Sequence, residues 1–168
     1  RLGITPTLAI VRMGENDGDL AYERGAMKRC AAAGVAVRLF VLPEQAEQQE
    51  LLNTIERINH DVDIHACLIF RPLPAHIDES CVRAALRPEK DVDGITAGSL
   101  AGLMLPQGQG FPPCTPRACI EILDHFGIEL AGKRVTLIGR SLVVGRPLAL
   151  MLIARDATLT ICHSRTVD

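Results

Sequence analysis

The sequence predicts an α/β protein with two domains and parallel sheets, and two observations support this prediction. Short apolar, β-branched runs alternate with stretches of helical periodicity, between Thr7 and Leu86 and again between Val135 and Cys162. A segment rich in proline and glycine, Arg87 to Pro113, separates these two regions and lacks strong periodicity. Residues 1–113 are therefore expected to form one domain. Residues 114–168 would supply an inter-domain helix and the first part of a Rossmann-like domain.

In the first region, strands and helices follow one another in turn. The predicted strands are Thr7 to Met13, Val35 to Leu42, and His65 to Phe70. The predicted helices are Asp19 to Ala33, which Gly34 closes, Gln45 to Asn59, and Ile77 to Leu86. This alternation favours a mainly parallel sheet.

The second region reads as a helix followed by a strand, turn, helix and strand. Thr115 is expected to cap a helix from Pro116 to Phe126. The remaining predicted parts are a strand from Val135 to Ile138, a turn from Gly139 to Gly145, a helix from Leu148 to Ala154 with Pro147 in its first turn, and a strand from Thr158 to Cys162. Together they make a βαβ unit.

A βαβ unit places backbone N–H groups and the positive end of a helix just past its first strand, where a dinucleotide pyrophosphate can bind. The usual fingerprint has an acidic residue at the end of the second strand. This strand is followed by His163, Ser164 and Arg165 instead, and their hydroxyl and guanidinium groups favour NADP over NAD. The candidate cofactor-binding residues are Gly139, Arg140, Ser141, Gly145, His163, Ser164 and Arg165. From the spacing alone, an ordinary tight turn remains an alternative.

Composition narrows the class of partner. The chain is 48% apolar and 23% charged, with a net charge of −2, which is typical of a soluble globular protein. The acidic balance and the shortage of aromatic residues argue against nucleic acid or an anionic membrane as a partner, so small molecules are expected. Six scattered cysteines without zinc-ligand spacing predict reduced thiols and no metal site. The expected location is cytoplasmic, because no signal peptide or membrane span is visible.

Both ends of the sequence look cut. The chain starts at Arg1 without an initiator methionine and enters a strand almost at once. It stops at Asp168, just after a strand whose sheet normally needs further strands to cover it. We therefore expect this sequence to be part of a longer protein.

Five segments in order resemble the methylenetetrahydrofolate dehydrogenase/cyclohydrolase family. They are Arg71 to Asp78, Lys90 to Gly94, Pro113 to Pro116, Gly139 to Pro147, and Cys162 to Thr166. The resemblance implies that the N-terminal half binds a folate, that the C-terminal half binds NADP, and that the protein is a homodimer of one-carbon metabolism, as in purine biosynthesis. It also implies that Tyr22 and Asp93 are catalytic, and that the substrate-binding residues are Tyr22, Phe70, Arg71, Pro72 and Asp93.

Two positions depart from the family pattern. The family has a lysine four residues after its tyrosine, on the same helix face, where this chain has Ala26. The family's glutamine before the Leu-Pro-Leu-Pro turn is replaced by Phe70. Lys28 lies on a different helix face, and Arg29 would be an electrostatic stabiliser and not an acid–base group. Arg71 is hypothesised to restore a positive charge for the folate.

The predicted function is NADP-dependent oxidation of 5,10-methylenetetrahydrofolate to 5,10-methenyltetrahydrofolate. Cyclohydrolase activity, the hydrolase half of the family's chemistry, is expected to be weakened or lost, because hydrolysis depends on a titratable side chain. One alternative is a catalytically impaired paralogue that binds NADP or folate as a regulatory protein. An unrelated NADP-dependent oxidoreductase is a third alternative, and retained turnover and folate binding distinguish the three.

Overall fold

The computed structural model describes residues 3–105 and 110–167. The chain forms two compact units, Arg1–Val92 and Asp93–Asp168. The sequence places the domain boundary after Pro113, whereas the units divide after Val92. The segment before Pro113 belongs to the second unit, where its Leu103 and Phe111 line one cavity together with Ile120 and Met151.

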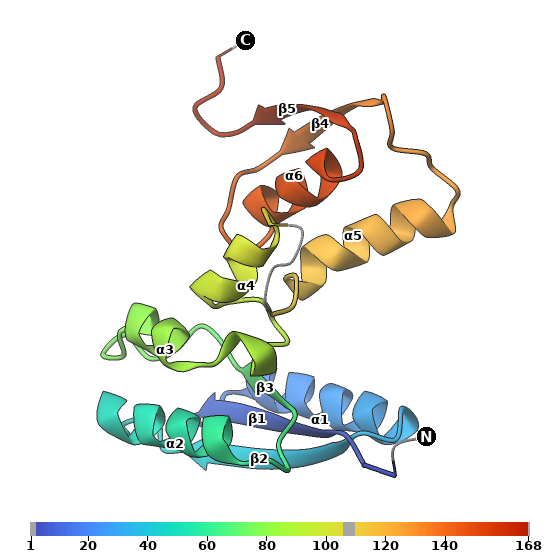
Figure 1. Cartoon of the computed structure of the whole chain (residues 1–168). Helices are drawn as coiled ribbons and strands as arrows, with labels where there is room; N and C mark the ends of the chain where they lie inside the picture. The colour runs from blue at the N-terminus through green and yellow to red at the C-terminus, as the bar shows by residue number, and fades with distance from the viewer. Residues whose placement is uncertain (1–2, 106–109, 168) are drawn as a thin grey trace. The chain divides into compact units, whose positions relative to one another are not determined.

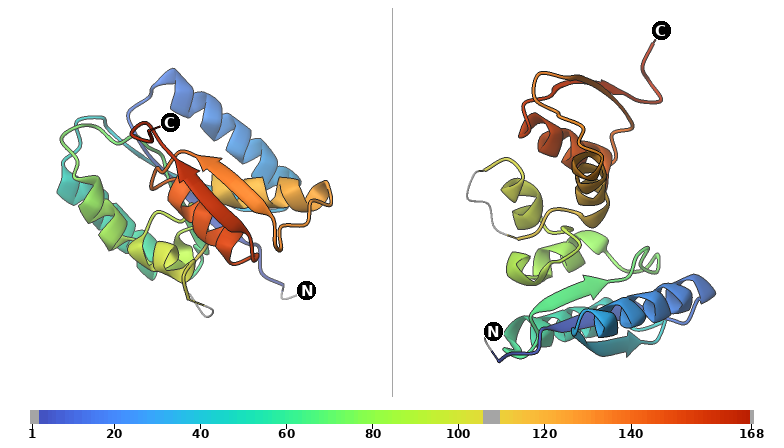
Figure 2. Two further views of the ribbon diagram at one scale, coloured as in Figure 1. Left: turned by 90° about the horizontal axis from the view of Figure 1, so that it is seen from above. Right: turned by 90° about the vertical axis from the view of Figure 1, so that its right-hand side faces the viewer.

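The first unit contains a three-stranded parallel sheet in the order β2-β1-β3 (Figure 1). The strands are β1 (Thr7–Met13), β2 (Ala36–Leu42) and β3 (Ala66–Ile69). The helices are α1 (Asp17–Ala32), α2 (Gln48–His60) and α3 (Glu79–Ala85). The crossovers through α1 and α2 run in opposite directions along the sheet, so right-handed connections place these helices on opposite faces (Figure 2).

Local signals explain where α1 begins and ends. Asn16 is its N-cap, and the Asn16 side-chain oxygen accepts a hydrogen bond from the backbone N–H of Asp19 at 2.8 Å. Past the other end of the helix, Gly34 adopts a φ of 72°, a left-handed conformation that suits glycine. The central strand β1 is buried on both faces, with Ala9, Ile10 and Val11 fully inaccessible.

The second unit contains α4 (Ala97–Gly102), α5 (Cys114–His125), β4 (Arg134–Ile138), α6 (Gly145–Ile153) and β5 (Thr158–Cys162). Strands β4 and β5 pair in parallel, which confirms the predicted βαβ unit. The core of this unit consists of Ile120, Leu130, Leu148 and Leu152, which come from α5, its following loop and α6. None of the helices in the described parts of the chain is both long and apolar enough to span a membrane.

Two expectations about the intervening segment were wrong. The stretch from Arg87 to Pro113 is not irregular throughout, since it contains a 3₁₀ turn (Pro88–Lys90) and α4. Helix α4 has only six residues, too few to show a periodic pattern, although Thr96 caps it by accepting the Ser99 N–H at 3.1 Å. Thr115 is not a cap: α5 starts at Cys114, after Pro113 as its N-cap residue.

Candidate functional site

The carboxyl ends of the three parallel strands meet at one edge of the first unit. A cavity of about 140 Å³ opens there, lined by Met13, Gly14, Glu15, Asn16, Glu44, Pro72, Leu73 and Pro74. Ligands of open α/β sheets bind at this edge, so the position fits a substrate site. Of the predicted substrate residues, Pro72 lines the cavity, and the Arg71–Pro72 peptide bond beside it is cis.

Phe70 is placed by the register of the sheet. Leu68 of β3 pairs with Ile10 of β1, and the Phe70 N–H continues the pairing by donating to the Val11 carbonyl at 2.8 Å. Because side chains alternate along a strand, Phe70 lies on the same face as Leu68 and Ile10. Phe70 is only 5% exposed. Its ring is therefore part of the packed interior, facing α1.

Tyr22 of α1 packs edge-on against the Phe70 ring. The two ring centroids are 5.2 Å apart and the ring planes are inclined by 64°, a favourable edge-to-face geometry. Tyr22 is 61% exposed, so its remaining surface is open to a ligand. The structure thus brings together two of the predicted substrate residues, and it does so through an apolar contact.

At both positions that depart from the family pattern, the side chain is apolar. Ala26 is half-buried one helical turn after Tyr22, and Phe70 covers the inner side of the Tyr22 ring. Neither side chain can exchange a proton. Lys28 and Arg29 are both exposed on α1.

Arg71 has an acidic neighbour. Its Nη1 lies 3.2 Å from the Oε1 of Glu79, at the start of α3, and the Arg71 side chain is 20% exposed. Glu79 therefore offsets part of the positive charge that Arg71 was expected to bring. Asp93 is half-buried and belongs to the second unit, so the predicted substrate residues are divided between the units.

In the second unit, the turn after β4 depends on two glycines. Gly139 has a φ of 118°, in the region that favours glycine, and its N–H donates to the Cys162 carbonyl at 2.8 Å. A Cβ on Gly145 would stand 2.5 Å from the Gly139 carbonyl oxygen. The chain can therefore bring the first turn of α6 this close to the end of β4 only with glycine at position 145.

The Ser141 side chain binds the backbone at the start of α6, whose N-cap residue is Val144. Its hydroxyl oxygen accepts the backbone N–H groups of Val144 at 3.1 Å and Gly145 at 3.3 Å. Arg140 is exposed, and its carbonyl accepts a hydrogen bond from the Arg146 Nε at 3.3 Å. Arg146 is a further exposed cation beside this turn, and it was not among the candidate cofactor-binding residues predicted from the sequence. A cation in the first turn of a helix opposes the helix dipole, and that unfavourable placement was the available signal.

The segment after β5 forms a compact turn at the same edge, because Cys162 pairs with Ile138. The Thr166 hydroxyl oxygen accepts the His163 N–H at 2.7 Å, and the His163 Nδ1 accepts the Arg165 N–H at 3.1 Å. Ser164 and Arg165 are exposed. The structure thus places all seven predicted cofactor residues at or beside the carboxyl ends of β4 and β5.

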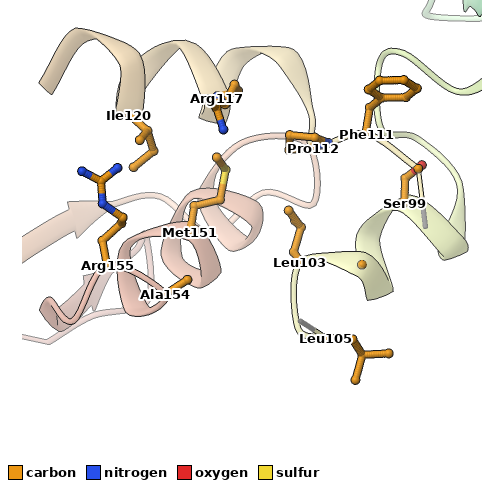
Figure 3. Close-up of a pocket in the computed structure, with 12 residues that line it drawn as sticks. Ser99, Leu103, Leu105, Phe111, Pro112, Arg117, Ile120, Met151, Ala154 and Arg155 are labelled. Atoms are coloured by element: carbon orange, nitrogen blue, oxygen red, sulfur yellow. The ribbon is translucent and has the colours of Figure 1, made fainter. Parts of the chain in front are cut away.

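A second cavity, of about 350 Å³, lies within the second unit between α4, α5 and α6 (Figure 3). Its walls are largely apolar and include Leu103, Phe111, Ile120 and Met151. Arg155, which also lines it, forms an ion pair with Asp124, and hydrogen bonding from Arg155 lowers the pKa of Asp124. Within residues 3–105 and 110–167, no three His, Cys, Asp or Glu side chains are grouped to hold a metal ion.

Two family models match the chain. The catalytic domain of tetrahydrofolate dehydrogenase/cyclohydrolase matches residues 1–93, and the NAD(P)-binding domain of the same enzyme matches residues 113–168. Together they cover most of the sequence and leave a gap that contains α4. The models thus name a catalytic domain in the N-terminal part of the chain and an NAD(P)-binding domain in the C-terminal part.

Curated relatives and solved structures agree with the family models. The bifunctional protein FolD of Clostridioides difficile is 45% identical over 98% of this chain and 57% of its own length. The FolD of Alkaliphilus oremlandii is 46% identical over 99% of this chain and 58% of its own length. The chain therefore spans just over half the length of these relatives.

The crystal structure of the FolD methylenetetrahydrofolate dehydrogenase/cyclohydrolase from Campylobacter jejuni is 37% identical, with a TM-score of 0.94 over 99% of this chain and 59% of that chain. The Trypanosoma brucei enzyme, solved with NADP cofactor and inhibitor, is 33% identical, with a TM-score of 0.89 over 98% of this chain and 56% of that chain. The family models, the relatives and the fold lead to one conclusion: the chain belongs to the tetrahydrofolate dehydrogenase/cyclohydrolase family.

Proposed function

We propose that the chain contributes the folate and NADP sites of a methylenetetrahydrofolate dehydrogenase whose cyclohydrolase activity is weakened or lost. The dehydrogenase part is supported by the relatives named above and by the glycine turn of the second unit. The loss of hydrolysis is supported by a single observation, the packing of Phe70 against Tyr22 with Ala26 one turn away.

The two reactions place different demands on these side chains. Hydride transfer requires the methylene carbon and the cofactor to be held in position, and bound NADP supplies the hydride acceptor. Hydrolysis of the methenyl product requires a side chain that moves protons to or from water. Tyr22, which is backed by the buried Phe70 ring, can hold a planar ring system, but Phe70 and Ala26 can move no proton. Oxidation is therefore expected to survive where hydrolysis does not.

The cofactor half has residues that fit NADP. The close approach of Gly145 to Gly139 leaves no room for a Cβ and brings the positive end of the α6 dipole close to the end of β4, which favours a phosphate there. Arg140, Ser164 and Arg165 are exposed at the adjoining strand ends and would bind the 2′-phosphate. Ser141 would support the turn from within, since its oxygen already accepts two backbone N–H groups.

The substrate half would use residues from the region 1–113. Tyr22 would contact the folate ring system directly, while Phe70 would hold the Tyr22 ring and Pro72 would shape the cavity at the strand ends. Asp93 would bind the pterin, as the family resemblance implies. We further propose a cytoplasmic homodimer, on the strength of the family resemblance.

The test supplies the full-length protein with methylenetetrahydrofolate and NADP, and follows NADPH and the methenyl product separately by absorbance. We expect NADPH to form and methenyltetrahydrofolate to accumulate, because the methenyl product should then be hydrolysed only at its spontaneous rate. Hydrolysis at a rate that matches NADPH formation contradicts the proposed loss. If no NADPH forms but NADP and folate both bind, the protein is the catalytically impaired paralogue instead. This is the second candidate function, and the Ala26 and Phe70 substitutions are the observation that favours it.

A gain of function would test the assigned cause. The double variant Ala26→Lys/Phe70→Gln restores both side chains of the family pattern and should raise methenyl hydrolysis about a hundredfold, the low end of general acid–base effects. Met27→Lys is the matched control, because it adds a lysine to the exposed surface one residue along α1. Equal hydrolysis by both variants would show that the position of the lysine does not matter.

The charge of Arg71 can be tested with substitutions of opposite expected effect. Arg71→Leu should weaken folate binding, and Glu79→Gln should strengthen it, because this second substitution removes a negative charge 3.2 Å from the Arg71 guanidinium. Folate dissociation constants measured by calorimetry decide the matter. Unchanged affinity in both variants would remove Arg71 from the substrate site.

A further inference from the structure

A buried ion pair joins β1 to α1 beside the candidate substrate site. Arg12 interrupts an apolar strand and is only 7% exposed. Its Nε donates to the Oε2 of Glu23 at 2.7 Å, and its Nη1 donates to the Gly14 carbonyl at the end of β1. Both charged side chains are almost fully enclosed, at 8% and 11% exposure. One guanidinium therefore ties together a strand, the loop that follows it and a helix.

Helix α1 has little else to fix its rotation. Among its sixteen residues, all of which the structure describes, Glu23 alone is buried. Leu20, Ala26 and Cys30 lie on the same face, but each is only half-buried. Apolar contact is non-directional, whereas a charged hydrogen bond at 2.7 Å defines both a distance and a direction. The ion pair is therefore the contact best suited to set the angle of α1.

The neighbouring contact of α1 involves Tyr22. Phe70 follows β3 next to Val11, so it lies beside Arg12 on the sheet face that α1 covers. Arg12 binds Glu23, and Phe70 packs against Tyr22, which is the preceding residue of the helix. Arg12 and Phe70, which are neighbours on the sheet, thus contact Glu23 and Tyr22, which are consecutive residues of α1.

We propose that Arg12 and Glu23 are positioning residues that act through Tyr22, holding its ring in line with the substrate. The inference rests on the proposed function, in which Tyr22 contacts the folate. A rotation of about 10° about the axis of α1 moves an atom at a radius of about 6 Å by about 1 Å. A misplacement of about 1 Å at a reacting centre can lower the rate by about a hundredfold.

The variants must separate position from stability. Arg12→Leu or Glu23→Leu alone leaves one buried charge without its partner, so each should unfold at lower urea concentration than the parent. In Arg12→Leu/Glu23→Leu both charges are replaced by apolar groups, so the urea midpoint should return close to that of the parent. This folded double variant lacks the directional contact and is the one to assay.

In the double variant we expect kcat for methylenetetrahydrofolate to fall at least about tenfold while the KM for NADP stays within about twofold. The same double substitution in a Tyr22→Ala background should have no further effect on kcat, because the residue it positions is already gone. Arg38→Leu is the matched control: it removes another ion pair of the first unit, Arg38–Asp61, which does not involve α1, and should leave kcat unchanged.

A second readout needs no turnover. Tyr22 is the only tyrosine among these 168 residues, and in protein labelled with 3-fluorotyrosine the ¹⁹F resonance that Tyr22→Phe removes is assigned to Tyr22. We expect that resonance to shift or broaden in the double variant and to stay in place in Arg38→Leu. If the folded double variant keeps the parent's ¹⁹F signal and kcat, the proposal is overturned. If the parent itself has no dehydrogenase activity, the proposed function fails, and the ¹⁹F comparison alone decides whether the pair positions Tyr22.

Discussion

The two units each present the carboxyl ends of parallel strands, but different contacts hold these two edges. In the second unit the edge is fixed by bonds between residues close in sequence, such as Ser141 with Val144 and His163 with Thr166. In the first unit it is fixed by pairs far apart in sequence, Tyr22 with Phe70 and Arg12 with Glu23. The turns at the strand ends of the second unit thus depend largely on local spacing, while the corresponding edge of the first unit depends on how the whole unit packs.

The largest expected effect tests the long-range side of this comparison. Phe70→Ala removes a buried ring and should lower the free energy of unfolding by about 3–5 kcal/mol, measured by urea denaturation. Phe70→Leu keeps most of the apolar volume and should cost about 1 kcal/mol, chiefly through the lost ring–ring contact. Equal losses in the two variants would mean that the volume at position 70 contributes little.

The next effect tests the local side. Gly145→Ala places a Cβ 2.5 Å from the Gly139 carbonyl oxygen, so it should cost about 1–3 kcal/mol and lower the affinity for NADP. The measurements are thermal unfolding and NADP titration by fluorescence. Gly25→Ala is the control, because a Cβ there meets nothing within 4 Å in the exposed part of α1 and should stabilise the protein by about 0.5–1 kcal/mol. A Gly145→Ala protein with parental NADP affinity would show that the close approach is not needed.

A smaller effect separates support of the turn from contact with the cofactor. Ser141→Ala removes the acceptor for two backbone N–H groups at the start of α6 and should cost about 1 kcal/mol of stability. Ser164→Ala, on the exposed turn after β5, should leave the unfolding midpoint unchanged and weaken NADP binding only. Denaturation and NADP titration of both variants give the two readouts. The reverse pattern would exchange the roles of the two serines.

The smallest effect is a pH dependence in the first unit. Hydrogen bonds from the Ser80 hydroxyl and N–H lower the pKa of Asp78, the N-cap of α3, from 3.8 to about 2. Because the folded pKa is depressed, the stabilisation is present above the unfolded value of 3.8 and is lost as the pH falls through about 2. Asp78→Asn should remove this slope from urea midpoints measured across that window. If the pH dependence of the urea midpoint persists in Asp78→Asn, other carboxylates are its cause.

Much of the fold could be predicted because it has a periodic signal. Helix α2 buries Leu51, Ile55 and Ile58 at helical spacing, and β4, α6 and β5 form the expected unit. Helix α4 was missed because six residues do not complete a pattern. Arg12 was also missed, although a charge within an apolar strand is a visible signal that a buried partner is needed.

The sequence by itself determined the parts whose contacts are local: the alternation of strands and helices, and a turn whose glycines are required at Gly139 and Gly145. Only the tertiary structure decided the environment of Tyr22. The register between β3 and β1 brings Phe70 to the face beneath α1, and a shift of one residue would turn Phe70 to the opposite face. Sheet register is set by packing across the whole unit, so no stretch of sequence near Tyr22 or Phe70 encodes their contact.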